Sequence, residues 1–261
     1  MGILVDVHCH LDHVAFKDDL DKVIERAKKL GMKAIITNGL NPETNRISLK
    51  LAEKYDIIKV ALGIYPIDAL QKEAESGEYP TTKQGFDVDE EIAFIRKNKD
   101  KIVAVGECGL DFKSGGHKEK QIEVFKKMIA LSVELQKPII VHSRKAEQEC
   151  IEVLEQFKTK KIVMHCFSGK VSLVKRVRDN GWFFSVPANI VFSQQFQRLV
   201  EEVPLSQLLT ETDAPLLSPF RGERNEPAFI AETIKKIAEI KKMDAAEVEN
   251  VIYNNYQRLF L

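Results

Sequence analysis

Short apolar runs rich in β-branched residues alternate with amphipathic stretches along almost the whole chain. Eight runs have the length of a buried strand, at residues 3–7, 34–37, 58–63, 102–105, 138–141, 162–164, 182–185 and 208–210. The stretches between them repeat apolar residues three and four positions apart, which is the period of a helix, at residues 19–30, 42–55, 88–98, 119–135, 145–157, 171–180 and 193–200. Strands that alternate with helices predict parallel β-α-β units. Eight such units predict an α/β fold of the (β/α)8 barrel type.

The length of the chain agrees with one barrel domain. The chain has 261 residues, close to the usual size of a (β/α)8 barrel, so we expect a single domain over residues 1–261. Two further helical stretches, at 227–240 and 244–261, predict extra helices at the C-terminus. Residues 71–87 are the least regular segment, and we interpret them as a loop near the site or a surface insertion.

Charge limits the kinds of partner that this chain can bind. Lys plus Arg equals Asp plus Glu, at 39 each, so the formal net charge is zero. A strongly basic protein that coats DNA is thereby excluded, and a nucleic-acid substrate would have to be bound by a few local cations and metals. The N-terminus lacks the pattern of a signal peptide. No apolar run approaches the roughly 18 residues of a membrane span, so we expect a cytoplasmic protein without membrane contact. The oligomeric state is left open, and a monomer is compatible with the sequence.

The cysteines do not suggest a disulfide framework. The chain has four, which is few for its length. Cys9, Cys108 and Cys166 each follow a candidate metal ligand by one position. Because side chains alternate along a strand, we expect these three thiols on the opposite face, buried between sheet and helices.

Candidate metal ligands lie at the ends of several predicted strands. His8 and His10 close the first apolar run, and the alternation of side chains points both into one site. The strand ends of a parallel barrel meet at one face, where active sites lie. The remaining candidates each follow a separate run: Glu107, His142, His165 and Asp213.

The number of candidates suggests a dinuclear centre. A tetrahedral site takes four ligands, and this chain offers six. We therefore predict two divalent ions, of Zn, Mg or Mn, that share Glu107. Two ions roughly 3.5–4 Å apart can activate a water and stabilise both the attacking and the leaving oxygen. Asp213 can bind metal and also accept the proton of that water. The ligands suit hydrolysis of phosphoesters and equally of C–N or C–O bonds.

The motifs around these residues resemble those of the TatD family of metal-dependent deoxyribonucleases, within the amidohydrolase-like barrels. The resemblance extends over nearly the whole chain. It is carried by DVHCHLD at 6–12, GECGLDF at 106–112, PIIVHSR at 138–144, HCFSG at 165–169, ETDAP at 211–215, RNEP at 224–227 and the closing residues from Asn254 and Asn255 to Phe260.

The resemblance implies a TIM-type barrel that trims DNA in the 3′→5′ direction. It implies that one metal is held by His8, His10, Glu107 and Asp213, and the second by Glu107, His142 and His165. It also implies that Asp213 is the general base. One position departs from the family pattern, because Tyr65 stands in Gly63-Ile-Tyr-Pro66 where the family usually has histidine. Tyr65 keeps a hydrogen-bonding tip but lacks an imidazole, so it is a candidate substrate contact, with packing as the alternative.

Other polar residues near the predicted strand ends are candidates for supporting roles. Arg144 follows His142 by two positions, so it could clamp a phosphate or form an ion pair with the next helix. The loop after the eighth strand, where barrels often bind phosphate, carries further candidate substrate contacts: Arg221, Arg224 and Asn225. Glu211 is expected to orient a ligand histidine. Asp111 is expected to orient a ligand or contact substrate, and a turn or cap role is its alternative.

The favoured function is therefore a dinuclear-metal deoxyribonuclease acting on DNA, at 3′ ends of single strands. One alternative is an ester or amide hydrolase on the same site, such as a D-aminoacyl-tRNA deacylase. The other is a non-catalytic metal-binding protein, which the intact ligand set disfavours because unused buried ligands are costly.

Overall fold

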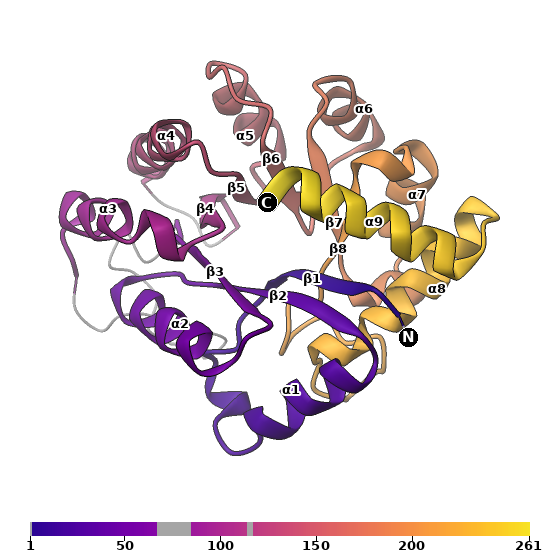
Figure 1. The fold of residues 1–261 in the computed structure, drawn as a ribbon. Coiled ribbons are helices and arrows are strands. Elements are labelled where there is room, and N and C mark those ends of the chain that lie inside the picture. The colour runs from indigo at the N-terminus through magenta and orange to yellow at the C-terminus, as the bar shows by residue number, and fades with distance from the viewer. Residues whose placement is uncertain (1, 67–84, 114–116) are drawn as a thin grey trace.

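The computed structural model describes residues 2–66, 85–113 and 117–261. Within them, eight strands form one sheet in chain order, and each neighbouring pair is parallel. The sheet curls into a barrel with helices around its outside (Figure 1), as the alternating pattern predicts. The strands are β1 (Leu4–Cys9), β2 (Met32–Asn38), β3 (Ile58–Leu62), β4 (Ala104–Asp111), β5 (Ile139–Arg144), β6 (Ile162–His165), β7 (Phe183–Val186) and β8 (Leu208–Thr210).

Helices follow the strands, and two more lie at the C-terminus, as predicted. The α-helices are α1 (Leu20–Lys29), α2 (Pro42–Lys54), α3 (Val88–Lys97), α4 (Lys118–Leu135), α5 (Glu147–Leu154), α6 (Val171–Asp179), α7 (Gln194–Glu202), α8 (Ile230–Lys241) and α9 (Ala245–Phe260). Short 3-10 helices are η1 (Val14–Phe16), η3 (Lys99–Lys101), η4 (Ala188–Val191), η5 (Leu205–Gln207) and η6 (Pro227–Phe229).

The amphipathic pattern of α1 explains how a helix packs on the barrel. Val23, Ile24 and Ala27 recur at helical spacing and are all buried. Burial of a side chain such as Ile24 contributes about 1.5–3 kcal/mol relative to exposure. Buried faces of this kind on the helices pack against the outside of the barrel, while buried strand residues complete the core.

The barrel closes at a seam between β1 and β8. Main-chain hydrogen bonds join the end of β1 to the residues that follow β8. Asp213 N–H donates to the carbonyl of His8 at 2.9 Å, and His10 N–H donates to the carbonyl of Ala214 at 2.8 Å. Thr210 adds a side-chain bond, from its Oγ1 to the carbonyl of Val5 at 2.6 Å. Because three candidate ligands lie in or beside this seam, closure of the barrel also brings them together.

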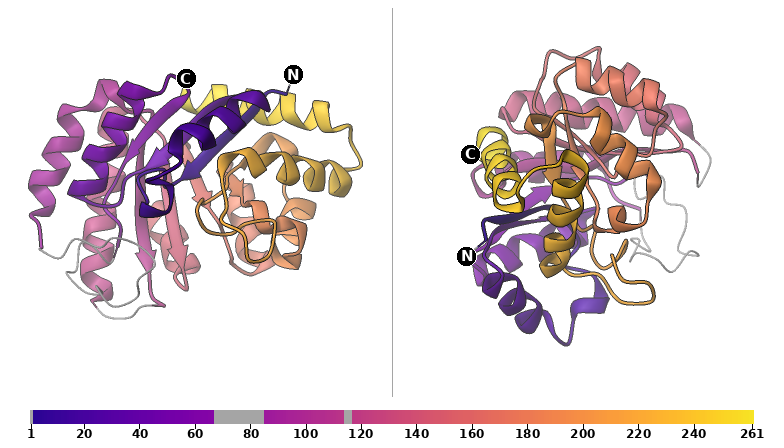
Figure 2. Two further views of the ribbon diagram at one scale, coloured as in Figure 1. Left: turned by 90° about the horizontal axis from the view of Figure 1, so that it is seen from below. Right: turned by 90° about the vertical axis from the view of Figure 1, so that its right-hand side faces the viewer.

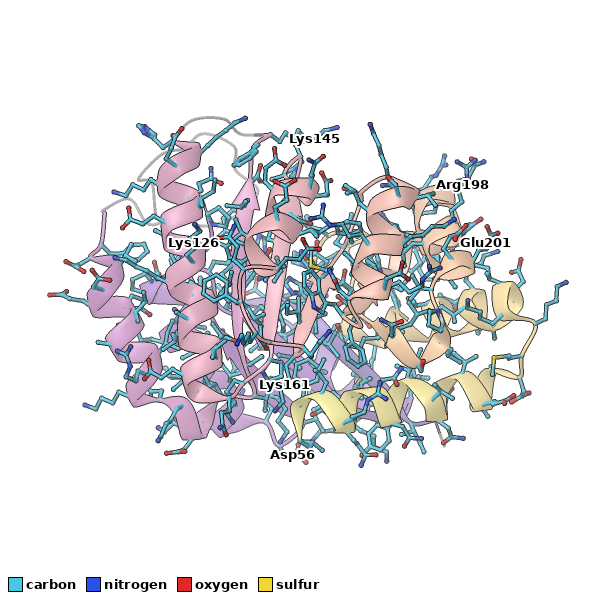
Figure 3. All side chains as sticks on the ribbon, turned by 90° about the horizontal axis from the view of Figure 1, so that it is seen from above. Asp56, Lys126, Lys145, Lys161, Arg198 and Glu201 are labelled. Atoms are coloured by element: carbon cyan, nitrogen blue, oxygen red, sulfur yellow. The ribbon has the colours of Figure 1, made fainter. Side chains whose placement is uncertain are left out.

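The two ends of the barrel differ. Helix α9 lies at the end where strands begin, because the Asn255 amide donates to the carbonyls of Leu205 and Leu208, both at 2.8 Å. Both chain termini lie at this end in both views of Figure 2. In Figure 3, Asp56 and Lys161 mark the end near α9, and Lys145, just after β5, marks the opposite end. That opposite end, where strands finish, is not covered by α9.

Some predicted boundaries differ from the structure. Strands β1 and β4 extend beyond the apolar runs, because polar ligand residues continue the extended backbone into the barrel. Of the irregular segment at 71–87, residues 71–84 lie outside the described residues. Within the part of the chain that is described, no helix is both long and apolar enough to cross a membrane.

Candidate active site

The six predicted ligands meet at the end of the barrel where the strands finish. His8 lies in β1, and His10 follows that strand by one residue. Glu107 lies within β4 and not after it, His142 lies in β5 and His165 ends β6. Asp213 follows β8. The structure thus joins residues that are separated by up to about 200 positions in the sequence.

The carboxylate of Glu107 lies at the centre of the cluster. Its Oε2 is 3.3 Å from His8 Nε2 and 3.5 Å from His10 Nε2. Its Oε1 is 2.8 Å from His142 Nδ1 and 3.4 Å from His165 Nε2. Each oxygen therefore faces a different pair of histidines, which is the arrangement that a bridging carboxylate needs.

Glycines allow the strands to approach each other around Glu107. A Cβ at Gly63 would lie 2.2 Å from the Glu107 carbonyl oxygen, well inside contact distance. Gly109 has φ of +148°, and a Cβ there would lie 2.0 Å from the carbonyl oxygen of His142. Larger residues at either position would push β3 or β5 away from β4 and separate the ligands.

Three donor atoms on one side of Glu107 have the spacing of a tetrahedral metal site. His8 Nε2 lies 3.2 Å from His10 Nε2 and 3.6 Å from Asp213 Oδ1. His10 Nε2 lies 3.4 Å from the same Asp213 oxygen. An ion with bonds of about 2.1 Å holds tetrahedral donors about 3.4 Å apart. The residues present therefore fit a divalent ion.

A second donor group shares Glu107. A Glu107 oxygen and one nitrogen each of His142 and His165 all lie within 4.8 Å of one another. The same holds for the donor atoms of His8, His10 and Asp213. Imidazole nitrogens and carboxylate oxygens are ligands that suit zinc, and carboxylates also suit magnesium and manganese. Two groups on either side of one carboxylate are compatible with two ions.

Burial and charge act in opposite directions on the histidines. Burial disfavours a charged imidazole, but the hydrogen bond to Asp213 and the charge of Glu107 outweigh it and raise the pKa of His10 to about 9. Burial likewise opposes a charged His165, yet Glu211 and Glu107 raise its pKa well above the usual value. Protons on these rings balance the buried carboxylates, and a divalent ion would replace them.

The two carboxylates at the centre are ionised at neutral pH. Burial favours a protonated Glu107, but the charges of His8 and His165 outweigh burial and hold its pKa well below the usual range. Burial opposes ionisation of Asp213 too, and the hydrogen bond with His10 overcomes it, so its pKa is lowered. Both groups are thus available as anionic ligands, and Asp213 can also accept a proton.

Outer residues fix the orientation of the ligand rings. Glu211, fully buried, lies with Oε2 3.1 Å from His165 Nδ1, and its Oε1 accepts from the Cys166 N–H at 2.9 Å. Asp111 Oδ2 lies 3.4 Å from His142 Nε2 and accepts from the Tyr65 hydroxyl at 3.0 Å. The same hydroxyl lies 3.2 Å from His142 Nε2. Tyr65 therefore belongs to the group that orients His142.

The sequence analysis did not single out Asp6, which supports the seam. Its carboxylate is buried and accepts from Thr212 N–H at 3.0 Å, Thr212 Oγ1 at 2.6 Å and His8 N–H at 3.2 Å. Burial, opposed by these hydrogen bonds, raises the pKa of Asp6 to about 8. The bonds hold β1 against the segment that carries Asp213. A carboxylate inside an otherwise apolar run is the signal that could have identified it.

A cavity of about 400 Å³ opens over the ligand cluster. Among the predicted substrate contacts, Tyr65 and Arg144 line it. Cys166 lines it as well, which corrects the expectation of a thiol packed between sheet and helices: β6 ends at His165, and Cys166 turns away with φ of +43°. Cys9 and Cys108 are buried as predicted.

The remaining predicted contacts do not line this cavity. Arg224 forms a paired ion bridge with Asp19, at 2.8 and 2.7 Å, which joins the loop to α1. Asn225 is buried and donates to the carbonyls of Thr212 at 2.8 Å and Leu216 at 2.6 Å. Arg221 is exposed at the surface of the same loop.

A parallel eight-stranded barrel with this donor cluster defines a class, the metal-dependent hydrolases built on a TIM barrel. Residues 5–261 match the family model described as TatD related DNase. A Methanocaldococcus jannaschii protein named as an uncharacterized metal-dependent hydrolase is 37% identical over 98% of this chain and 96% of its own length. Human deoxyribonuclease TATDN3 is 35% identical over 98% of this chain and 94% of its own length. The chain belongs to the TatD-related DNase family.

Solved structures agree with this assignment. The crystal structure of a TatD homolog from Escherichia coli has a TM-score of 0.85 and 28% identity, and covers 98% of this chain and 97% of its own. A TatD family hydrolase from Entamoeba histolytica has a TM-score of 0.84 at 21% identity, which supports the fold alone. The family predicted from the motifs is thereby confirmed.

Proposed function

We propose that this protein is a dinuclear-metal deoxyribonuclease that removes nucleotides from the 3′ ends of single-stranded DNA. One observation carries the proposal: the two oxygens of Glu107 face two separate histidine pairs beneath an open cavity. Family membership supports hydrolysis, and the names of the relatives support DNA as the substrate.

The donor groups support the division of metal ligands that the family resemblance implies. His8, His10, Glu107 and Asp213 would hold one ion, and Glu107 with His142 and His165 the other. Ions bound there would supply Lewis acidity and neutralise the charge of a phosphodiester.

Asp213 is proposed as the general base. Its carboxylate is ionised at neutral pH because of its hydrogen bond with His10, and it lies at the edge of the cavity. From there it can accept the proton of an attacking water, provided that the water lies within hydrogen-bond reach.

Two residues of the cavity wall are proposed to hold the substrate. Arg144 is exposed at the end of β5 and lines the cavity, so its guanidinium can bind a phosphate through paired hydrogen bonds. Tyr65 offers its ring to a terminal nucleotide, while its hydroxyl keeps the contacts with Asp111 and His142 that fix both rings.

Further residues are proposed to act through others. Glu211 and Asp111 keep the rings of His165 and His142 in position. Arg224 and Asn225 are proposed to support substrate binding by shaping the loop after β8, and Arg221 to contact the strand directly. The cytoplasmic location expected from the sequence stays a prediction.

The test uses metal-stripped protein reloaded separately with Mg²⁺, Mn²⁺ or Zn²⁺. Linear single-stranded DNA labelled at its 5′ end should give a ladder that shortens one nucleotide at a time, and circular single-stranded DNA should stay intact. The Asp213→Asn variant, purified in parallel, reports any contaminating nuclease.

Rapid cutting of the circle would contradict the requirement for a 3′ end. D-aminoacyl-tRNA is included because the deacylase alternative uses the same site. Release of the amino acid without cleavage of any DNA would replace the proposed function by that alternative. Inactivity towards both substrates with every metal would refute the proposed function.

A further inference from the structure

Two phenylalanines stand exposed on the loops that follow β7 and β8. Phe192 is 45% exposed and Phe220 is 41% exposed. A single exposed apolar side chain needs no explanation, but these two are connected. The guanidinium of Arg221, next to Phe220 in the chain, lies over the Phe192 ring at 5.4 Å from its centroid. We call Phe192, Phe220 and Arg221 the aromatic rim.

Residues close to the aromatic rim in the chain line the cavity over the ligand cluster or contact its wall. Leu216 and Leu217, which line the cavity, precede Phe220 by only a few residues in the loop that begins at Asp213. On the other side, the Gln195 amide contacts the carbonyl of Ser168, another residue of the cavity wall, and Gln195 follows Phe192 by three positions. A strand leaving the cavity on this side would meet the rim.

Local contacts fix the rim in place. The N–H of Phe192 donates to the Asn189 carbonyl at 3.1 Å. The Phe220 ring packs edge-on against Phe229, with centroids 5.0 Å apart. Asn225 holds the base of the loop, since its N–H donates to the Pro215 carbonyl at 3.0 Å. The rings are therefore held in position while a large part of each stays open to solvent.

The chemistry of the rim suits unpaired bases. Every nucleobase has a π-face, so stacking on aromatic rings binds single strands without regard to sequence. The guanidinium of Arg221 adds a cation beside the rings, and among the described residues no carboxylate lies within ion-pair distance of it. Paired bases in a duplex hide the faces that such rings bind.

We propose that the aromatic rim binds the bases of a DNA single strand whose 3′ end occupies the cavity, by stacking on Phe192 and Phe220, with Arg221 contacting the backbone phosphate. This inference rests on the proposed function. It adds a strand-binding surface outside the metal cluster, and it explains how a chain without net charge holds DNA through few electrostatic contacts.

The experiment measures binding and cleavage separately. Binding is followed by fluorescence anisotropy of 5′-labelled single-stranded DNA with phosphorothioate linkages at its 3′ end. Phe192→Ala and Phe220→Leu are compared, the leucine being chosen to keep an apolar contact with Phe229. Leu30→Ala is the matched control, because Leu30 is 47% exposed before β2, at the opposite end of the barrel. Thermal melting checks the fold of each variant.

A second probe of the same length carries abasic sites upstream of the terminal nucleotide. Loss of a stacked base weakens binding about 5- to 100-fold. We expect both rim variants to lose affinity for normal DNA in this range. Their affinity for the abasic probe should differ little from that of wild type, and the control should match wild type with both probes. Unchanged affinity of the rim variants, or an equal loss with both probes, would refute the binding role of the rim. Cleavage of DNA by the wild-type protein would still support the proposed function in that case. Wild-type protein that neither binds nor cleaves DNA would refute both.

Discussion

Removal of metal should reverse the direction in which stability changes with pH. Metal-free protein should lose stability as pH rises, whereas metal-loaded protein should gain it. In the metal-free protein the pKa of His10 is about 9 instead of its ordinary 6.5, because Asp213 and Glu107 outweigh burial. A raised pKa stabilises the folded state fully below pH 6.5, and that stability is lost as pH rises through 9. The raised pKa of Asp6, about 8, acts in the same direction.

The magnitude follows from the shift of His10. A difference between 6.5 and about 9 corresponds to about 3 kcal/mol of unfolding free energy. For a chain of 261 residues this amounts to a fall in Tm of about 6 °C between these two pH values. Metal-loaded protein should behave oppositely, because an ion competes with protons for the same nitrogens and binds more tightly as pH rises.

The assay is calorimetry of chelator-treated and metal-loaded protein at several pH values between 6.5 and 9. The gap between their Tm values should widen as pH rises. The His10→Asn variant is the control, since without the imidazole the metal-free curve should flatten. Metal-free wild-type protein that is equally or more stable at pH 9 than at pH 6.5 would refute the reasoning.

Four other predictions concern the proposed chemistry and substrate binding. Asp213→Asn should lower kcat by about 10²–10⁴-fold with the fold intact in circular dichroism, and a variant with most of its activity would remove Asp213 as the base. Metal titration should saturate activity at two equivalents, whereas saturation at one would leave His142 and His165 to orient substrate. Arg144→Ala should raise KM with little change in kcat; an unchanged KM would limit Arg144 to a structural role. The affinity for single strands should fall with salt at a slope of two or three phosphate contacts, each contributing about −0.7, and a much steeper slope would contradict local binding.

The sequence is sufficient to predict the barrel because two independent patterns agree. Helical periodicity as in Val23, Ile24 and Ala27 and the short β-branched runs both repeat along the chain. His8 and His10 could be assigned to one site since alternation along a strand needs no tertiary information. The proposed division of the ligands between two ions came from the family motifs and stays a prediction.

Other features depend on contacts that no local pattern contains. The orientation of His142 depends on Asp111, which ends β4, and on Tyr65, which lies three residues after β3. Cys166 enters the cavity because the backbone leaves the strand at that point, and alternation holds only within a strand. Arg224 resembles a substrate contact in sequence, yet its partner Asp19 lies about 200 residues away.

The main-chain contacts that close the barrel at the seam also bring the candidate ligands His8, His10 and Asp213 together. The His8 carbonyl accepts from the Asp213 N–H, and the His10 N–H donates to the Ala214 carbonyl. The Asp6 carboxyl group accepts from the N–H and the hydroxyl of Thr212, which precedes Asp213. An ion bound by the side chains of His8, His10 and Asp213 would therefore cross-link the first strand to the segment after the last. Since such an ion binds the folded chain far better than the unfolded one, its binding free energy adds to the stability of the closed barrel. Opening at this seam would separate His8 and His10 from Asp213 and so break the ligand set.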